Sequence, residues 1–225
     1  SVTSLLVDLD SDGDQDLAVA TNPLLLLAEN DGRGQFTPRV GLYTGMESRS
    51  ICAADYDQDG DLDIYVCVYS PSSISHVLPI PLPYQDANNG GANMLFRNEG
   101  DFQFLNATAQ TGLDANNTRY SLAAAWEDYD NDGDVDLYVA NDYGRNNLYR
   151  NDAGRFTDVA AEAQVEDIAS GMSVMGPMSV VPPFMSGFVT TGGGSGRRSS
   201  SGQAVVSSAS PMSSESRRFM ERTRM

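Results

Sequence analysis

The chain has 225 residues and a formal net charge of −17, with 31 acidic residues against 14 basic ones. So acidic a surface repels the phosphates of nucleic acids and of anionic membranes, and we expect neither as a partner. No apolar run reaches the ~20 residues that a membrane-spanning helix needs, so we also expect no membrane insertion.

The first expected elements are two short strands joined by an acidic loop. Residues 4–7 (SLLV) and 17–20 (LAVA) are apolar runs bounded by turn residues, which is typical of buried strands. Residues 8–16 between them read DLDSDGDQD. The same D-x-D-x-D-G-x-x-D pattern returns at 55–63, between apolar runs 50–54 and 64–68, and at 128–136, between 122–126 and 137–140. The sequence therefore predicts a repeated strand–loop–strand unit.

The acidic loops are typical of sites for a hard cation. Carboxylates this closely spaced repel one another unless a cation lies among them, and Ca²⁺ accepts six to eight oxygen ligands in a flexible shell. Glycine at the sixth position permits the sharp turn. We expect about three calcium ions, with side-chain ligands at positions 1, 3, 5 and 9 and a backbone carbonyl at position 7. The predicted ligands are Asp8, Asp10, Asp12, Asp14, Asp16, Asp55, Asp57, Asp59, Asp61, Asp63, Asp128, Asp130, Asp132, Asp134 and Asp136.

The loops have two alternative interpretations. An EF-hand would need a bidentate Glu at position 12 and a helix on each side, but position 12 is Val19, Val66 or Val139 and the flanks are predicted strands. An acidic turn that binds nothing is the other alternative, and three complete copies of the pattern argue against it.

A second repeated feature follows each loop. Residues 29–36, 97–104 and 150–156 each combine an Asn, a turn and a Phe, which predicts a hairpin leading into the next strand. The Asn follows the first Asp of its loop by 22 residues in the first repeat, 43 in the second and 23 in the third. About 21 extra residues therefore lie in the second repeat. Without them the period is that of a four-stranded propeller blade.

The extra residues form an insertion over about residues 70–92. Proline at positions 71, 79, 81 and 83 excludes a helix or a central strand. We expect a surface loop with polyproline II geometry over part of 78–84. One hypothesis is that it shapes a ligand surface with Tyr84 and His76, since long loops are often functional. The other is a decoration without a role.

The two cysteines, Cys52 and Cys67, flank the second loop on adjacent predicted strands. Small apolar residues stand at most of the corresponding positions of the other repeats, which favours ordinary packing. A cross-strand disulfide stays open. Two cysteines and one distant histidine make a poor ligand set for zinc.

Residues 137–141 (LYVAN), 147–151 (NLYRN) and 155–160 (RFTDVA), together with the third loop, resemble the FG-GAP (VCBS-type) repeats of integrin-α-like β-propellers. The resemblance covers about residues 1–175 and is closest to the FG-GAP proteins that carry an ASPIC/UnbV region, such as the cartilage acidic protein type. Two departures are Glu127, where the family usually has Gly, and the loss of most of the Gly-Ala-Pro element.

The resemblance implies an all-β fold, namely a seven-bladed, calcium-stabilised propeller of which this chain supplies about three to four blades. The remaining blades would then lie in the full-length chain. It also implies an extracellular or secreted protein that serves adhesion or binding of a protein or carbohydrate ligand. The chain itself shows no signal peptide.

Residues 176–225 change in character. After Asp167 the chain holds seven of its nine Met and only two acidic residues, and 192–201 are low-complexity Gly/Ser/Arg. Such a segment cannot bury a core, so we expect a disordered tail. We suspect a frameshift as the origin of this segment, because the family pattern predicts an aromatic-Gly-Asp continuation where the chain reads Met175-Gly176, and a genuine Ser/Gly tail is the alternative. A fourth acidic loop in another reading frame of the coding DNA would establish the frameshift.

For function, we expect a non-catalytic interaction module. Every clustered aspartate is already assigned as a metal ligand, and a single histidine cannot serve a Ser-His-Asp or Cys-His set beside them. One alternative is a calcium-dependent enzyme acting on polysaccharides, in which Glu127, outside the ligand pattern, would be the carboxylate to test. A purely structural part of a larger secreted protein is the other.

Overall fold

The computed structural model describes residues 3–45, 47–70 and 80–167 of the chain. Within these ranges the fold is all-β, as predicted, with one short helix. The elements are β1 Thr3–Val7, β2 Asp16–Ala20, β3 Leu24–Asn30, β4 Phe36–Tyr43, β5 Ser48–Ala54, β6 Asp63–Val68, β7 Met94–Asn98, β8 Phe104–Asn106, α1 Thr108–Thr111, β9 Ser121–Glu127, β10 Asp136–Asn141, β11 Asn147–Asn151 and β12 Phe156–Asp158. The predicted tail and its boundary at residue 175 lie outside the described residues, as does His76.

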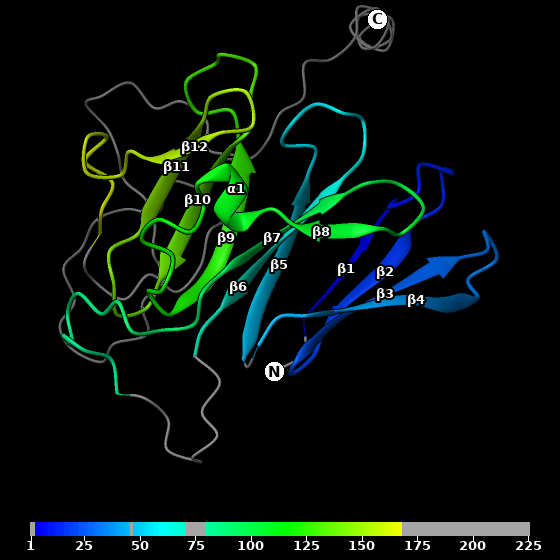
Figure 1. The fold of residues 1–225 in the computed structure, drawn as a ribbon, viewed down its shortest axis with the longest axis horizontal. Coiled ribbons are helices and arrows are strands. Elements are labelled where there is room, and N and C mark those ends of the chain that lie inside the picture. Colours follow the sequence, from blue (N-terminus) through cyan, green and yellow to red (C-terminus); the bar gives the residue numbers. More distant parts are fainter. Residues whose placement is uncertain (1–2, 46, 71–79, 168–225) are drawn as a thin grey trace, which may run out of the picture. The chain divides into compact units, whose positions relative to one another are not determined.

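The strands form three four-stranded sheets that follow one another in chain order (Figure 1). Each sheet is an antiparallel meander: β1 to β4, β5 to β8, and β9 to β12. The first strand of each sheet lies close to the first strand of the next, β1 to β5 and β5 to β9. Four-stranded meanders related in this way are the blades of a propeller.

Two apolar layers hold the sheets together. Leu25 and Leu27 of β3 pack with Ile64 of β6 between the first and second sheets. Tyr65 of β6 packs with Tyr149 of β11 between the second and third. All five side chains are fully buried, and burial of each contributes roughly 1.5–3 kcal/mol. Strand β6 is apolar on both faces because its sheet, the second, lies between the other two.

The outward face of the first sheet is less covered. Leu17 and Val19 of β2 are only partly buried, and Leu6 and Leu26 beside them are exposed. Counted from the end of the acidic loop, Leu17 corresponds to Ile64 of the second sheet, which is completely buried. The first sheet therefore exposes to solvent the apolar face that, in the second sheet, is buried against a neighbouring sheet.

The predicted hairpins are present in all three sheets. In each, the third strand ends at the Asn of the motif and the fourth begins at its Phe. The helix α1 lies in the segment after β8, where Ala107 and Leu113 cover the layer between the second and third sheets. The segment after β12 places Val159 and Val165 over the third sheet in the same way.

The part of the insertion that the structure describes, residues 80–92, contains no helix or strand, as the prolines predicted. It lies at the opposite end of the sheets from the acidic loops, since it connects β6 to β7. Backbone hydrogen bonds attach it to the third sheet: Ala87 N donates to Tyr143 O (2.9 Å) and Gly90 N to Thr118 O (2.9 Å). The insertion is therefore an ordered part of the fold over these residues.

Both cysteines have free thiols and pack in the layer between the second and third sheets. Cys67 pairs with Ser50 in the β5–β6 register, whereas Cys52 pairs with Tyr65, so the two are offset along the strands. Burial raises the pKa of the Cys52 thiol to about 12 and also raises the pKa of Cys67. The packing interpretation is confirmed.

Candidate metal centres

Each acidic loop joins the first two strands of a sheet. The first aspartate comes directly after the first strand, and the ninth is the first residue of the second strand. The loops also share their backbone: the sixth-position Gly13, Gly60 and Gly133 have φ of 95°, 100° and 101°. Residues that carry a side chain rarely adopt such φ angles, which explains why the sixth position is glycine.

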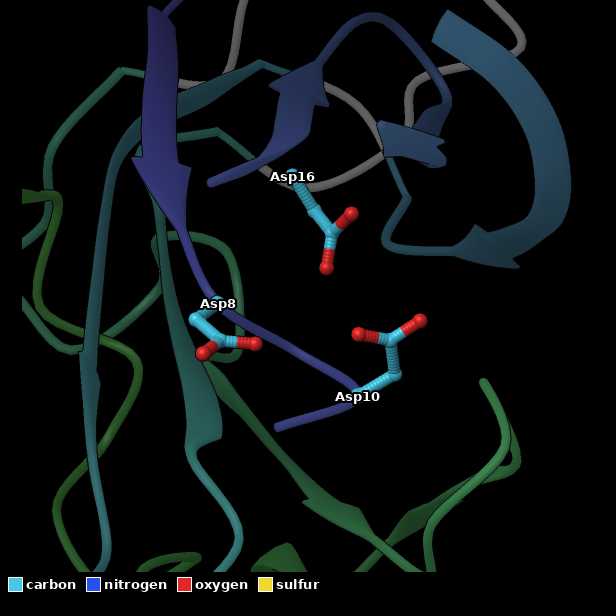
Figure 2. A group of neighbouring side chains, drawn as sticks. All are labelled: Asp8, Asp10 and Asp16. Carbon is cyan, nitrogen blue, oxygen red and sulfur yellow. The ribbon is translucent and has the colours of Figure 1, made fainter. Parts of the chain in front are cut away.

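The structure brings the first, third and ninth aspartates of each loop together. One oxygen from each lies within 4.8 Å of the other two, in three separate groups. Figure 2 shows the first group, in which Asp8, Asp10 and Asp16 turn their carboxylates toward a common space. The other groups are Asp55, Asp57 and Asp63, and Asp128, Asp130 and Asp136. Three carboxylates at this spacing are a suitable oxygen donor set for a hard divalent cation.

The ninth aspartate is the anchor of each group. Asp63 is completely buried, and its Oδ2 accepts the backbone N–H of Tyr56 (3.2 Å) while its Oδ1 accepts that of Asn98 (2.9 Å). Asp16 and Asp136 are buried and bonded in the same pattern. The backbone thus fixes the orientation of this carboxylate, and each oxygen keeps a further lone pair for a ligand.

Burial makes negative charge costly at Asp63 and Asp136. It is the main cause that raises the pKa of Asp63 to about 7 and that of Asp136 to about 6, with nearby aspartates adding to the effect. The pKa of Asp10, Asp57 and Asp130 at the third position is raised as well, first by burial and then by neighbouring carboxylates. A divalent cation among these groups would offset that cost.

Two buried oxygens in these groups lack a hydrogen-bond partner. They are Oδ1 of Asp8 and Oδ1 of Asp57. A buried acceptor without a partner costs roughly 1–3 kcal/mol, so such atoms usually have a ligand, an ion or water. Each belongs to one of the carboxylate triads, and the triads therefore fit the calcium ion that the sequence predicts.

The fifth and seventh aspartates lie outside the triads. At the fifth position, Asp12, Asp59 and Asp132 each accept the backbone N–H of the seventh residue, at 2.9–3.0 Å. At the seventh, Oδ2 of Asp134 accepts the backbone N–H of Ala153 in the hairpin turn (2.8 Å). This side chain is bonded to the hairpin and is not among the triad residues, which is compatible with the backbone carbonyl predicted at that position. Coordination by the fifth aspartate stays a prediction.

The hairpin asparagines are functional candidates whose role the sequence did not reveal. Asn98 and Asn151 are completely buried, and each donates to the loop of its own sheet and to the loop of the preceding sheet. The signal in the sequence is the return of Asn at the same place in every hairpin, which the sequence pattern assigns to turn chemistry alone.

Glu127 ends β9, directly before the third loop, and is partly buried. It is not among the triad residues.

Three four-stranded meanders, each with an acidic loop between its first two strands, define a repeat protein built from propeller-type blades. Residues 8–66 and 128–181 match the family model of the FG-GAP-like repeat. These two stretches make up half of the chain, which therefore belongs to the FG-GAP-like repeat family. The region between them contains the insertion. No curated protein matches the chain.

Proposed function

We propose that the protein is a calcium-binding β-propeller module that binds a ligand and catalyses no reaction. The observation that carries the proposal is the threefold repetition of one carboxylate triad around a buried, backbone-anchored aspartate. Calcium would hold the loops between the first two strands of each blade. The ions are structural in this proposal, because they lie within the framework of the blades.

Calorimetric titration of the metal-free chain with calcium tests the proposal. We expect about three ions per chain with dissociation constants of ~10⁻⁴ to 10⁻³ M, the range of extracellular calcium modules. Magnesium is expected to bind more weakly, because it demands a smaller octahedral shell and gives up its water reluctantly. A folded sample that takes up no calcium would show that the loops are acidic turns.

Further blades of the same family would complete the module in the full-length protein. The support is the outward face of the first sheet, where Leu6 and Leu26 are exposed and Leu17 is only partly buried. Its counterparts in the other blades, Ile64 and Leu137, are fully buried against a preceding blade. A total of seven blades, and the closer likeness to the ASPIC/UnbV type, belong to the same proposal.

An extracellular location and a role in adhesion are part of the proposal, and the family membership supports the location, since proteins with such repeats are typically extracellular. None of the described residues forms a helix long and apolar enough to cross a membrane. We retain the alternative of a polysaccharide-acting enzyme only as the one to be tested with Glu127→Gln, since no observation on the described residues favours it.

The insertion provides the proposed ligand surface. Ile80, Leu82 and Tyr84 are 61–70% exposed, at the end of the blades opposite the acidic loops. Tyr84 packs against Tyr143 of the third blade, with ring centroids 5.2 Å apart and ring planes inclined at 56°. Exposed aromatic and aliphatic groups on an anchored loop are suited to contact a protein or a sugar ring.

Replacement of Tyr84 by Ser is expected to weaken binding at this surface by about tenfold or more, the size of an interface hot spot. The measurement is binding to a panel of immobilised polysaccharides and extracellular-matrix proteins. Tyr43→Ser is the matched control, because Tyr43 is 61% exposed on the outer strand of the first blade, against 65% for Tyr84. Equal binding by both variants and the unaltered protein would show that the insertion is not part of the ligand surface.

A further inference from the structure

Each pair of neighbouring acidic loops is joined by a continuous chain of hydrogen bonds. In the first pair, the Leu9 N–H donates to Oδ2 of Asp16 (2.9 Å), and the Leu9 carbonyl accepts from Nδ2 of Asn98 (2.8 Å). The backbone N–H of Asn98 then donates to Oδ1 of Asp63 (2.9 Å). The chain therefore runs from the ninth aspartate of the first loop to that of the second.

The second pair of loops repeats the same arrangement. The Tyr56 N–H donates to Oδ2 of Asp63 (3.2 Å), and the Tyr56 carbonyl accepts from Nδ2 of Asn151 (2.8 Å). The Asn151 N–H donates to Oδ1 of Asp136 (2.8 Å). Both bridging asparagines are fully buried, so the bonds are shielded from water, which would otherwise compete for the same groups.

The bridge joins the loops at the points where a cation would order them. Leu9 and Tyr56 are second-position residues, each between the first and third aspartates of its triad. A cation bound by those two aspartates would fix the backbone of the second-position residue between them. The carbonyl of this residue in turn fixes the side-chain amide of the asparagine. The backbone N–H of the asparagine then orients the ninth aspartate of the next loop.

We propose that Asn98 and Asn151 are positioning residues that couple the loops, so that calcium in one loop raises the affinity of the next. The proposal rests on calcium binding as proposed above. An ion that orders the first loop lowers the ordering cost in the second, which gives positive cooperativity. By thermodynamic linkage the effect is reciprocal, and couplings of this kind are typically about 5- to 150-fold.

Asn30 supplies an internal control. Its backbone N–H donates to Oδ1 of Asp16 (2.8 Å) and its Nδ2 to the Gln15 carbonyl (3.0 Å), which are the contacts that Asn98 makes within its own blade. Among the described residues it makes no bond to a second loop. Replacing Asn30 therefore removes the local contacts of the hairpin without removing a bridge.

The test is a double-mutant cycle on the full chain, with the third loop disabled by Asp130→Asn throughout. Terbium serves as the calcium analogue, because its emission is sensitised by the tyrosine of the second loop, Tyr56, whereas the first loop has Leu9 at that position. Asp10→Asn empties the first loop. We expect this change to lower the terbium affinity of the second loop by ~5-fold or more when Asn98 is present.

In the Asn98→Ala background, Asp10→Asn is expected to change that affinity by less than about twofold, whereas in Asn30→Ala the full effect is retained. Asn98→Ser serves if Asn98→Ala fails to fold, since serine is too short to reach Leu9. An unchanged effect without Asn98 would overturn the proposal. The proposal would also be overturned if Asp10→Asn left the terbium affinity of the second loop unchanged in the protein that keeps Asn98. This result needs no Asn98 variant. Absence of terbium and calcium binding altogether would instead overturn the calcium proposal.

Discussion

Calcium added to the metal-free protein at about 10 mM is expected to raise its Tm by roughly 10–30 °C. A ligand that binds only the folded state stabilises it by ~1.4 kcal/mol per site at ten times the Kd and by ~2.7 kcal/mol at one hundred times. Three sites with Kd of ~10⁻⁴ to 10⁻³ M would together contribute about 4–8 kcal/mol. For a domain of this size, each kcal/mol moves Tm by about 2–4 °C.

A structural reason to expect stabilisation by calcium is the burial of the ninth aspartates Asp63 and Asp136. Burial raises the pKa of Asp63 and Asp136, and this shows that the folded protein holds their negative charge at a cost when no cation is near. The measurement is a pair of thermal melts, in calcium and in chelator, with magnesium at the same ionic strength as the control. Equal Tm values in calcium and chelator would contradict the expectation.

Asp63→Ala is expected to produce the second large effect, the loss of one of about three calcium ions together with a fall in stability. The substitution leaves the N–H groups of Tyr56 and Asn98 without their acceptor, at roughly 1–3 kcal/mol each. In calcium the binding energy of one site is lost as well. The free energy of unfolding should then fall by about 3–9 kcal/mol.

In chelator the same substitution should destabilise the protein much less, because it also removes a carboxylate whose charge is disfavoured by burial. This difference between the two conditions separates a metal ligand from a residue that is only structural, which would cost the same stability in both. The matched control is Asp61→Asn in the same loop. Since the seventh position is predicted to use its backbone carbonyl, this variant should keep its calcium stoichiometry and its Tm within a few degrees.

Calorimetry gives the number of ions, and melts in both conditions give the change in stability. If Asp63→Ala still bound as many ions as the unaltered chain, the second loop would not use its ninth aspartate as a ligand. If Asp61→Asn lost an ion, the side chain at the seventh position would be a ligand instead of the backbone.

Local patterns determined much of the fold. The apolar runs on either side of each loop became β1, β2, β5, β6, β9 and β10 within one or two residues of their predicted bounds, because β-branched and apolar residues between turn residues favour strands regardless of their neighbours. The Asn–Phe motif located every hairpin for the same reason. The loop pattern also predicted which side chains would supply carboxylates, since the carboxylates of nine contiguous residues cannot lie far from one another.

The tertiary structure decided what the local patterns left open. It placed the first, third and ninth aspartates in one group, because the ninth is oriented by the hairpin, as Asp63 is by the N–H of Asn98, whereas the fifth accepts a backbone N–H of its own loop. It also placed Asn98 against Leu9 and Asn151 against Tyr56, pairs 89 and 95 residues apart. Such contacts depend on how one blade packs on the next, and packing is set by the whole apolar layer.

By itself, then, the sequence determined the all-β repeat, the three acidic loops and the residues that could hold cations in them. Only the tertiary structure showed that Asn98 and Asn151 link neighbouring loops, while Asn30, with the same local contacts, links none within the part of the chain that the structure describes. The physical reason is that an amide side chain has the same local preference in every hairpin. Its second partner exists only where another blade brings a loop carbonyl within reach.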